Sequence, residues 1–323
     1  MPKAIRIHET GGPDVLRWED VAVGDPGPGQ VRLHQTAVGL NYIDTYQRSG
    51  LYPLELPITL GMEAAGEVTA LGDGVDGLAV GDRVAYASPP VGAYAEERLM
   101  PADRLVKLPD AIDDRRAAAM MLQGMTVQYL LRRTYRVQPG DTILFHAAAG
   151  GVGLIACQWA AALGATVIGT VGSAEKAALA QAHGCHHTIN YREEDFVARV
   201  MEITDGKGVA AAYDSVGKDT FDGSLACLRP LGTLALFGQA SGPVPPVDLS
   251  RLAKGSTFVT RPTLFVYTAD PGDLQATAKE LLDVVGSCKV KIEVNQTYPL
   301  AETAQAHRDL EARKTTGSTV LLP

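Results

Sequence analysis

Along residues 142–237, short apolar runs alternate with longer segments in which apolar residues recur at helical spacing. The apolar runs predict strands at Thr142–His146, Thr166–Thr170, Thr188–Asn190, Val209–Asp214 and Thr233–Phe237. The segments between them predict helices at Val152–Leu163, Ser173–His183, Glu193–Thr204 and Thr220–Leu228. Because strands that alternate with helices of this length pair in parallel, we expect an α/β fold with a doubly wound parallel sheet.

The residues before this region show a different pattern of apolar runs and turns, which predicts a separate domain at 1–123 followed by a second at 124–262. Short strand-like runs at Lys3–Ile7, Val31–Val38, Gly66–Leu71 and Arg83–Ala87 lie between glycine- and proline-rich turns, so we expect this domain to be mostly β. One helix is predicted from Arg116 to about Arg133. Residues 263–323 predict a helix near Asp273–Val285 and a strand–helix–strand tail that packs back on the first domain.

A glycine-containing turn joins the first of the parallel strands to its helix. The turn reads AAAGGVG over residues 147–153, with Ala148 at the position where the first glycine of a dinucleotide-binding turn usually stands. Gly150 lets the backbone approach a pyrophosphate, Gly153 lets the helix lie close to its strand, and the first helical N–H groups attract negative charge. The turn therefore predicts a dinucleotide site, with a purely packing role as the alternative.

The end of the second parallel strand indicates which nicotinamide cofactor is bound. A carboxylate there bonds the ribose of NAD, but residues 170–173 read TVGS and contain none. Ser173 is a predicted N-cap and Lys176 projects from nearly the same face, a combination that suits a phosphate dianion. Tyr191, after the third strand, is placed for an adenine-side contact. We therefore predict NADPH, the alternative being an ordinary cap and a solvated lysine.

Composition narrows the function classes further. The formal charge is −8, from 29 basic and 37 acidic residues, which disfavours a nucleic-acid partner. No apolar run approaches the ~20 residues of a membrane span, and no amino-terminal signal is recognisable. The 4 cysteines show no C-x-x-C spacing, so neither a disulfide framework nor a cysteine zinc site is predicted. We expect no membrane association and a cytoplasmic location.

Segments outside the turn resemble a known family. TVGSAEK, INYRE, DSVG and RKTTGS, with GLNYIDTYQRSGLYP and GMEAAGEV near the amino end, resemble the quinone oxidoreductases, the ζ-crystallin-like branch of the medium-chain dehydrogenases and reductases. The resemblance covers essentially the whole chain. It implies a GroES-like catalytic domain, a Rossmann NADPH-binding domain, a nicotinamide cleft between them and a homodimer joined through the Rossmann sheets. It also implies reduction of small-molecule quinones, which the family is associated with performing in one-electron steps that give semiquinones.

The same resemblance bears on zinc. Zinc alcohol dehydrogenases of the superfamily carry a His before the Glu of the segment that corresponds to GMEAAG. Met62 stands at that position beside Glu63, and Asn41–Tyr46 contains neither Cys nor His. Because a thioether beside one carboxylate does not supply tetrahedral N and S ligands, the chain resembles the zinc-free branch, and we expect no metal. Reduction of an electrophilic quinone or enone is then the expected chemistry.

The resemblance further implies a set of cofactor contacts. These contacts fall into five sets of residues. The first lies near the nicotinamide, in the amino-terminal domain and on the linking helix; the second is the pyrophosphate turn; the third lies on the 2′-phosphate side; the fourth lies at later strand ends; and the fifth is one arginine in the tail. In that order they are Asn41, Asp44, Thr45 and Tyr129; Gly150, Gly151 and Val152; Gly172, Ser173, Lys176 and Tyr191; Ser215, Phe237, Gly238 and Gln239; and Arg313.

Four side chains are candidates for contact with the substrate. Asn41, Tyr46 and Tyr52 offer an amide and two phenols that can bond or stack on a quinone. Arg261 is suited to stabilise a developing oxyanion, the alternatives being loop packing for the tyrosines and an ion pair for the arginine. Two other functions stay open: an NADPH-dependent enone or alkenal double-bond reductase, and a non-catalytic crystallin-like or RNA-binding protein.

Overall fold

The computed structural model describes every residue from Met1 to Pro323, and these residues form two compact units. Unit 1 comprises Met1–Gln123, Thr268–Leu282 and Ile292–Pro323. Unit 2 comprises Gly124–Tyr267 and Asp283–Lys291, so the division falls within helices α3 (Met121–Tyr129) and α9 (Pro271–Gly286). None of the helices is both long and apolar enough to cross a membrane.

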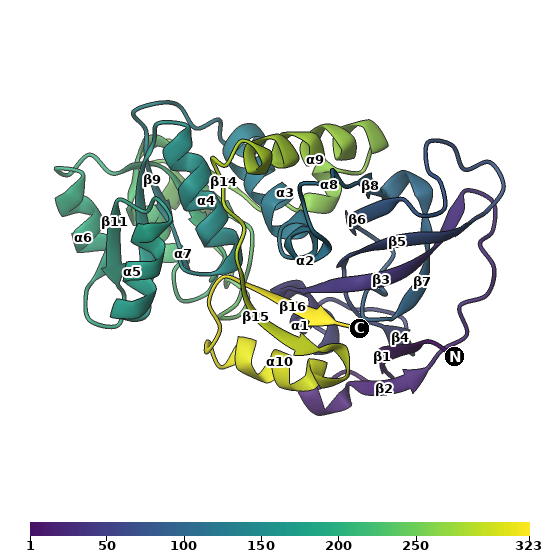
Figure 1. Ribbon diagram of the computed structural model, residues 1–323. Coiled ribbons are helices and arrows are strands. Elements are labelled where there is room, and N and C mark those ends of the chain that lie inside the picture. The colour runs from purple at the N-terminus through teal and green to yellow at the C-terminus, as the bar shows by residue number, and fades with distance from the viewer. The chain divides into compact units, whose positions relative to one another are not determined.

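Unit 1 is built mainly on antiparallel strands (Figure 1). The long strand β3 (Gln30–Leu40) lies in the middle of its larger sheet and pairs with β5 (Glu63–Leu71), β7 (Glu97–Pro101) and β16 (Ser318–Leu322). The sheet continues through β6 (Arg83–Ala87) to β8 (Val106–Lys107) on one side and to β15 (Val294–Pro299) on the other. A smaller sheet has the order β2-β1-β4, with the bounds Arg17–Asp20, Lys3–Ile7 and Ile58–Thr59.

The alternation of apolar residues along these strands gives unit 1 its core. Val31, Leu33, Val68, Val84 and Met100 are fully buried or nearly so in one cluster. Three helices lie wholly in this unit, namely α1 (Tyr42–Arg48), α2 (Asp114–Ala118) and α10 (Thr303–Glu311), and most of α9 belongs to it as well. Short 3₁₀ turns occupy Pro13–Val15, Ala102–Arg104 and Leu300–Glu302. The amino and carboxyl ends of the chain lie near each other in this unit (Figure 1).

Unit 2 contains the parallel sheet that the sequence predicts, with the strand order β11-β10-β9-β12-β13-β14. The strands span His187–Asn190, Thr166–Val171, Thr142–Phe145, Val209–Asp214, Leu228–Leu236 and Phe258–Thr260. The helices are α4 (Gly151–Ala162), α5 (Ala174–Ala182), α6 (Phe196–Ile203), α7 (Phe221–Ala226) and α8 (Leu264–Tyr267), with a 3₁₀ turn at Leu249–Leu252.

The strand order of unit 2 reverses direction at β9. From β9 the chain first moves outward to β10 and β11, and it then returns to β12 on the other side of β9. Leu144 of β9 is accordingly in register with Ile168 of β10 and with Ala212 of β12. Ligands of open α/β sheets bind at the carboxyl ends of the strands on either side of such a reversal. The turn at residues 147–153 begins at this point.

Most predicted elements are present, but several boundaries differ, three of them in ways that change an element. The single helix expected from Arg116 to Arg133 is instead α2, a break, α3 and a π-helical turn at Leu130–Thr134. The strand expected at Thr233–Phe237 begins earlier, at Leu228, with a register shift in its pairing with β12. The strand expected to include His146 ends at Phe145. Helix α1 and strands β2, β7 and β8 were not predicted.

Candidate functional site

The glycine-containing turn at residues 147–153, which the sequence predicts to bind a pyrophosphate, brings the start of α4 close to β9. Gly150 is the N-cap of α4, and its own N–H donates to the carbonyl of Ala147 at 2.9 Å. A Cβ on Gly153 would lie 2.4 Å from that carbonyl oxygen, so only glycine lets α4 begin this close to β9. At Gly150 the nearest atom to an added Cβ is 3.2 Å away. The first N–H groups of α4 are therefore available to a phosphate.

The end of β10 brings together four predicted cofactor residues and one that the prediction did not include. Ser173 caps α5 by accepting the N–H of Lys176 at 3.3 Å. A Cβ on Gly172 would lie 2.8 Å from Tyr191 Oη and 3.6 Å from Arg192 Nε, so both side chains return over this glycine. The guanidinium of Arg192 adds a cation to the site, and its place inside the INYRE segment was the available signal.

The ends of β12 and β13 bring the next group of predicted residues together. An added Cβ on Gly238 would lie 2.5 Å from the carbonyl oxygen of Ser215, which shows that the two backbones run side by side. Phe237 donates its N–H to the backbone carbonyl of Asp214 at 2.8 Å. The backbone of Gln239 lies against Gly217, where an added Cβ would be 2.9 Å from the Gln239 Cα. These residues occupy the same carboxyl edge of the sheet as the pyrophosphate turn.

Tyr129 and Arg261 lie near each other in unit 2. The ring of Tyr129 stacks on Tyr267, with centroids 4.5 Å apart and an interplanar angle of 10°. Burial raises the pKa of Tyr129, and the positive charge of Arg261 partly opposes that shift. Arg261 donates from Nη1 to the carbonyl of Leu236 at 2.9 Å, which holds its side chain at the end of β13. Tyr267 was not predicted from the sequence.

In unit 1, the predicted residues Asn41 and Asp44 meet two buried groups at the start of α1. Asn41 is the N-cap, and its N–H donates to Asp44 Oδ2 at 2.8 Å in a capping box. The Asn41 amide donates to Glu63 Oε2 at 2.7 Å, and the N–H of Leu122 donates to Glu63 Oε1 at 2.7 Å. Thr45 donates its hydroxyl to the carbonyl of Tyr42 at 2.8 Å.

A buried chain of hydrogen bonds continues from Asp44 to the carboxyl-terminal helix. Tyr94 donates to Asp44 Oδ2 at 2.8 Å, and its oxygen lies 3.0 Å from His307 Nε2. Arg48 Nη1 lies 2.9 Å from His307 Nδ1 and also pairs with Glu311. Because arginine only donates, His307 accepts at Nδ1 and carries its proton on Nε2. All donors in the chain therefore point toward Asp44.

Burial changes the protonation of these groups. It raises the pKa of Asp44 to about 7 and that of Glu63 to about 8, while the hydrogen bonds from Asn41 and the other donors oppose the shifts. Burial lowers the pKa of His307 to about 3, and the positive charge of Arg48 lowers it further. Asp44 Oδ1 is buried and has no hydrogen-bond partner. Burial therefore favours the protonated form of Asp44 up to about neutral pH.

These shifts predict a pH-dependent stability. When a carboxyl group has a higher pKa in the folded state than in the unfolded state, the protein loses folding free energy as the pH rises from the unfolded-state pKa to the folded-state pKa. Because the pKa of His307 is lowered, its contribution makes the protein more stable as the pH rises, but only up to pH 6.5. Above that pH, the contributions of Asp44 and Glu63 determine how stability changes with pH. We expect the melting temperature to fall between about pH 6.5 and 8, and to fall less in Asp44→Asn. Thermal unfolding followed by circular dichroism checks this, with exposed Asp25→Asn as control; equal slopes for all three proteins would contradict it.

The remaining predicted residues lie in unit 1, and their surroundings differ. The rings of Tyr46 and Tyr52 meet edge to face with centroids 5.3 Å apart, and the N–H of Tyr52 donates to the carbonyl of Tyr46 at 3.0 Å. They therefore form one aromatic pair beside α1. Arg313 follows α10 with a left-handed backbone (φ 57°) and an exposed side chain. The carbonyl of Leu310 accepts both the N–H of Arg313 at 3.0 Å and the hydroxyl of Tyr42 at 3.3 Å.

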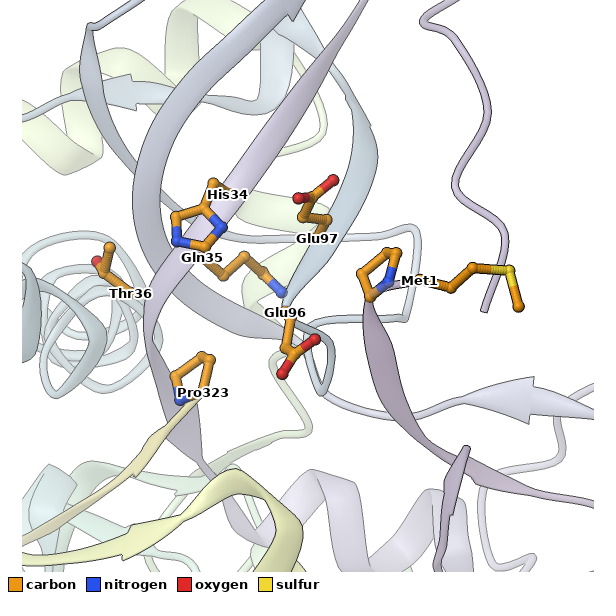
Figure 2. Close-up of a pocket in the computed structure, with 8 residues that line it drawn as sticks. Met1, His34, Gln35, Thr36, Glu96, Glu97 and Pro323 are labelled. Atoms are coloured by element: carbon orange, nitrogen blue, oxygen red, sulfur yellow. The ribbon is translucent and has the colours of Figure 1, made fainter. Parts of the chain in front are cut away.

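No three His, Cys, Asp or Glu side chains come together in a group that could hold a metal ion. One hollow of about 610 Å³ opens on the surface of unit 1 beside both chain ends. Figure 2 shows its lining, which includes Met1, His34, Glu96, Glu97 and Pro323. The hollow contains none of the residues that the sequence predicts for cofactor or substrate, so the candidate site lies elsewhere.

Comparisons with known proteins agree with this geometry. Residues 27–110 match the alcohol dehydrogenase GroES-like domain, and residues 151–283 match the zinc-binding dehydrogenase family. Over all of both chains, the sequence is 56% identical to a quinone oxidoreductase of Pseudomonas aeruginosa. It is 51% identical to a 2-haloacrylate reductase of a Burkholderia species, over 100% of this chain and 99% of that one.

A solved structure extends the comparison to three dimensions. The Escherichia coli quinone oxidoreductase complexed with NADPH superimposes with a TM-score of 0.97 at 48% identity, covering 99% of this chain and 100% of that one. A GroES-like β unit together with a parallel dinucleotide-binding sheet defines a medium-chain dehydrogenase/reductase, a class of oxidoreductases. Within that class, the chain belongs to the quinone oxidoreductase family.

Proposed function

We propose that this protein catalyses the NADPH-dependent reduction of quinones. The observation that carries the proposal is the end of β10, where the side chains of Tyr191 and Arg192 lie over Gly172, Ser173 accepts the backbone N–H of Lys176, and no carboxylate stands at residues 170–173. A carboxylate there would repel the 2′-phosphate of NADPH, whereas two cations and a helix N-cap attract it. The full-length similarity to a quinone oxidoreductase complexed with NADPH supports the same cofactor.

The residues of both units fit this cofactor chemically. We propose that the N–H groups at Gly150, Gly151 and Val152 bind the pyrophosphate, and that the strand ends at Ser215, Phe237, Gly238 and Gln239 line the same edge of the sheet. For the nicotinamide portion we propose Asn41, Asp44, Thr45 and Tyr129, with Arg313 as a further contact. The bound cofactor supplies the reducing electrons, and the protein orients it and excludes water.

For the substrate we propose a contact set of Asn41, the aromatic pair Tyr46–Tyr52, and Arg261. The Asn41 amide is already oriented by Glu63, and a phenol can donate to a quinone oxygen or pack against the ring. The Arg261 guanidinium, held at the end of β13, is suited to stabilise negative charge that develops on the substrate.

We propose that the reaction needs no zinc. Met62 occupies the position at which zinc-dependent members of the superfamily carry a histidine, and it is 1% exposed. The neighbouring Glu63 supplies only one carboxyl group, whose oxygens accept hydrogen bonds from Asn41 and Leu122. A zinc site requires several N, O or S donors with free lone pairs in tetrahedral arrangement.

Reduction of an activated carbon–carbon double bond is the second candidate function. The specific observation that favours it is the 51% identity to a 2-haloacrylate reductase over essentially the whole chain. Both reactions need the cofactor in the same position. They differ in which acceptor molecule fits against the residues that contact the substrate. The pair Tyr46–Tyr52 suits a flat ring better than a small alkenal, which is why we place quinones first.

The experiment that tests the proposal is oxidation of NADPH and NADH by purified protein with a chelator present. The acceptors are 1,2-naphthoquinone, a small alkenal and a 2-haloacrylate. Chelator-resistant, NADPH-preferring turnover of the quinone supports the proposal. Turnover of only the alkenal or haloacrylate favours the second function. NADPH binding with no turnover, displaced by RNA at low salt, would favour the non-catalytic alternative.

Lys176 offers a direct test of the 2′-phosphate assignment. We expect Lys176→Ala to weaken NADPH binding by about 1–2 kcal/mol, or roughly tenfold, while NADH binding changes little, because one charge-assisted contact is lost. Arg192→Ala should act in the same direction. Dissociation constants for both cofactors, from fluorescence titration, check this. Equal losses for NADPH and NADH would remove the assignment.

We also propose a homodimer joined through the parallel sheets, in a cytoplasmic setting where the 4 cysteines stay free. Strand β14 is the edge of its sheet, and the side chains of Phe258 and Val259 on it are 58% and 39% exposed. An edge with unpaired backbone groups and exposed apolar residues pairs readily with a second copy. An antiparallel pairing of two β14 strands would join the sheets.

The dimer is tested by Phe258→Glu. Two buried carboxylates would face each other across the interface, so we expect the variant to be a monomer at micromolar concentration. Light scattering coupled to size-exclusion chromatography measures the mass. Val80→Glu is the matched control, because Val80 is 63% exposed but belongs to unit 1. A wild-type protein that elutes as a monomer would contradict the proposal directly.

A further inference from the structure

A buried chain of polar side chains links three strands just below the candidate cofactor edge of unit 2. His146 Nδ1 lies 2.9 Å from Thr170 Oγ1, and His146 Nε2 lies 2.9 Å from Ser224 Oγ. Ser224 donates in turn to Asp214 Oδ2 at 2.7 Å. None of these four residues is more than 2% exposed. The chain connects His146, which directly follows β9, with β10, β12 and α7 at the end of the sheet where the candidate turn begins.

The carboxylate of Asp214 determines the direction of every bond in this chain. Asp214 Oδ1 accepts the N–H groups of Val216 and Gly217, and the Thr220 hydroxyl bonds the same carboxylate. Because a carboxylate only accepts, Ser224 donates to it and receives the Nε2 proton of His146. Burial lowers the pKa of His146, so the ring is neutral and its Nδ1 accepts from Thr170.

The arrangement is unlike that of a hydrolase. Ser224 stands between the histidine and the aspartate, and its hydroxyl proton is committed to Asp214. A nucleophilic serine requires the histidine to accept its proton and requires access to a substrate. The serine has no exposed surface at all. These side chains therefore hold structure in place and do not react.

The structure that His146 holds is strained. Ala147 follows it directly and has a φ of +54°, a left-handed conformation that side-chain-bearing residues rarely adopt. From this conformation the Ala147 carbonyl accepts the N–H of Gly150 at 2.9 Å, and Ala148 donates to the carbonyl of Thr170 at 3.0 Å. Such a residue persists only where its surroundings over-determine it. Both neighbours of the strained residue are bonded to β10, one of them through the His146 side chain.

We propose that His146 is a positioning residue for the cofactor: its bonds to Thr170 and Ser224 hold Ala147 in the left-handed conformation that leaves the first N–H groups of α4 open to the pyrophosphate. This inference rests on the proposed NADPH site. It requires no contact between His146 and the cofactor. Loss of the side-chain bonds lets the turn leave the competent conformation, and the apparent dissociation constant rises as that conformation becomes less populated.

The test is a set of three variants measured by NADPH titration and steady-state kinetics. We expect His146→Leu to raise the dissociation constant for NADPH about tenfold, if the competent turn falls to about a tenth of the population, with kcat at saturating NADPH unchanged. Adding Ala147→Gly to this variant should recover a substantial part of the affinity, because glycine adopts positive φ without strain. Thr170→Val removes the hydroxyl that bonds His146 and serves if His146→Leu does not fold.

The control is His183→Leu, which removes another buried histidine of unit 2 whose Nδ1 lies 2.8 Å from the carbonyl oxygen of Leu179. It should bind NADPH as the wild type does. Folded His146→Leu or Thr170→Val with wild-type affinity would overturn the inference, as would a loss that Ala147→Gly fails to recover. A wild-type protein that does not bind NADPH would instead contradict the proposed function, so the two failures are distinct.

Discussion

Gly153→Val is expected to lower kcat/KM for NADPH by roughly a hundredfold, equivalent to about 3 kcal/mol, because the helix can no longer lie against its strand. An added Cβ at this position would lie 2.4 Å from the Ala147 carbonyl oxygen and 2.6 Å from that of Ala148. Both contacts are to backbone, so no side chain can rotate away. The start of α4 must move outward, and the N–H groups that we assign to the pyrophosphate move with it.

Two further glycine substitutions make this result specific. Gly286→Ala, at the end of α9, has no atom within 4 Å of the new Cβ and should leave activity unchanged. Gly150→Ala meets the protein only at 3.2 Å, so it should fold normally and lose affinity only if a phosphate approaches there. Steady-state kinetics with varied NADPH measure all three. Wild-type kinetics for Gly153→Val would show that the turn is not the cofactor site.

Arg48→Met is expected to reduce the free energy of unfolding by about 3–5 kcal/mol, because it leaves buried acceptors unsatisfied and removes a buried charge from its pair. The Arg48 side chain is 3% exposed, bonds the Gly11 carbonyl and His307, and pairs with Glu311 through both terminal nitrogens. Its removal leaves His307 Nδ1 without a donor and Glu311 without its cation. The orientation of Tyr94 toward Asp44 then loses its support.

Urea unfolding at pH 7 measures this effect, and a neighbour on α10 provides the control. Arg308 pairs with Asp14, but the two side chains are 44% and 87% exposed. Exposed ion pairs of this kind contribute about 0–1 kcal/mol, so Arg308→Met should change stability little. Similar losses in the two variants would show that burial of Arg48 carries no special weight. The spectra of both folded variants should match that of the wild type.

The break between α2 and α3 shows why part of the fold was hidden in the sequence. Residues 116–133 carry helix-forming apolar residues throughout, and their local pattern predicts one helix. The N–H of Leu122, however, donates to Glu63, which is 59 residues earlier in the chain. A carboxylate that accepts a first-turn N–H allows a new helix to begin there. That acceptor exists only after β5 has folded into place.

The residues of the candidate site also fall into those that the local sequence predicts and those that only the folded structure brings together. The missing carboxylate at residues 170–173 and the INYRE segment are local features, and the structure places Tyr191 and Arg192 over Gly172. The sequence pattern offered no reason to connect Asp44 with His307, because 263 residues separate Arg48 from its partner Glu311. Their polar groups meet inside unit 1, where low dielectric shifts their pKa values.

Taken alone, the sequence determined the alternation of strands and helices, the glycine turn at residues 147–153 and the absence of an acid after β10. Each of these depends on neighbours within a few residues, where side-chain size and backbone φ act directly. Only the tertiary structure decided the pairing of β16 with β3, the cap on α3, and the chain from His146 to Asp214. These contacts join residues distant in sequence, and a hydrogen bond between them needs both partners desolvated and brought together by folding.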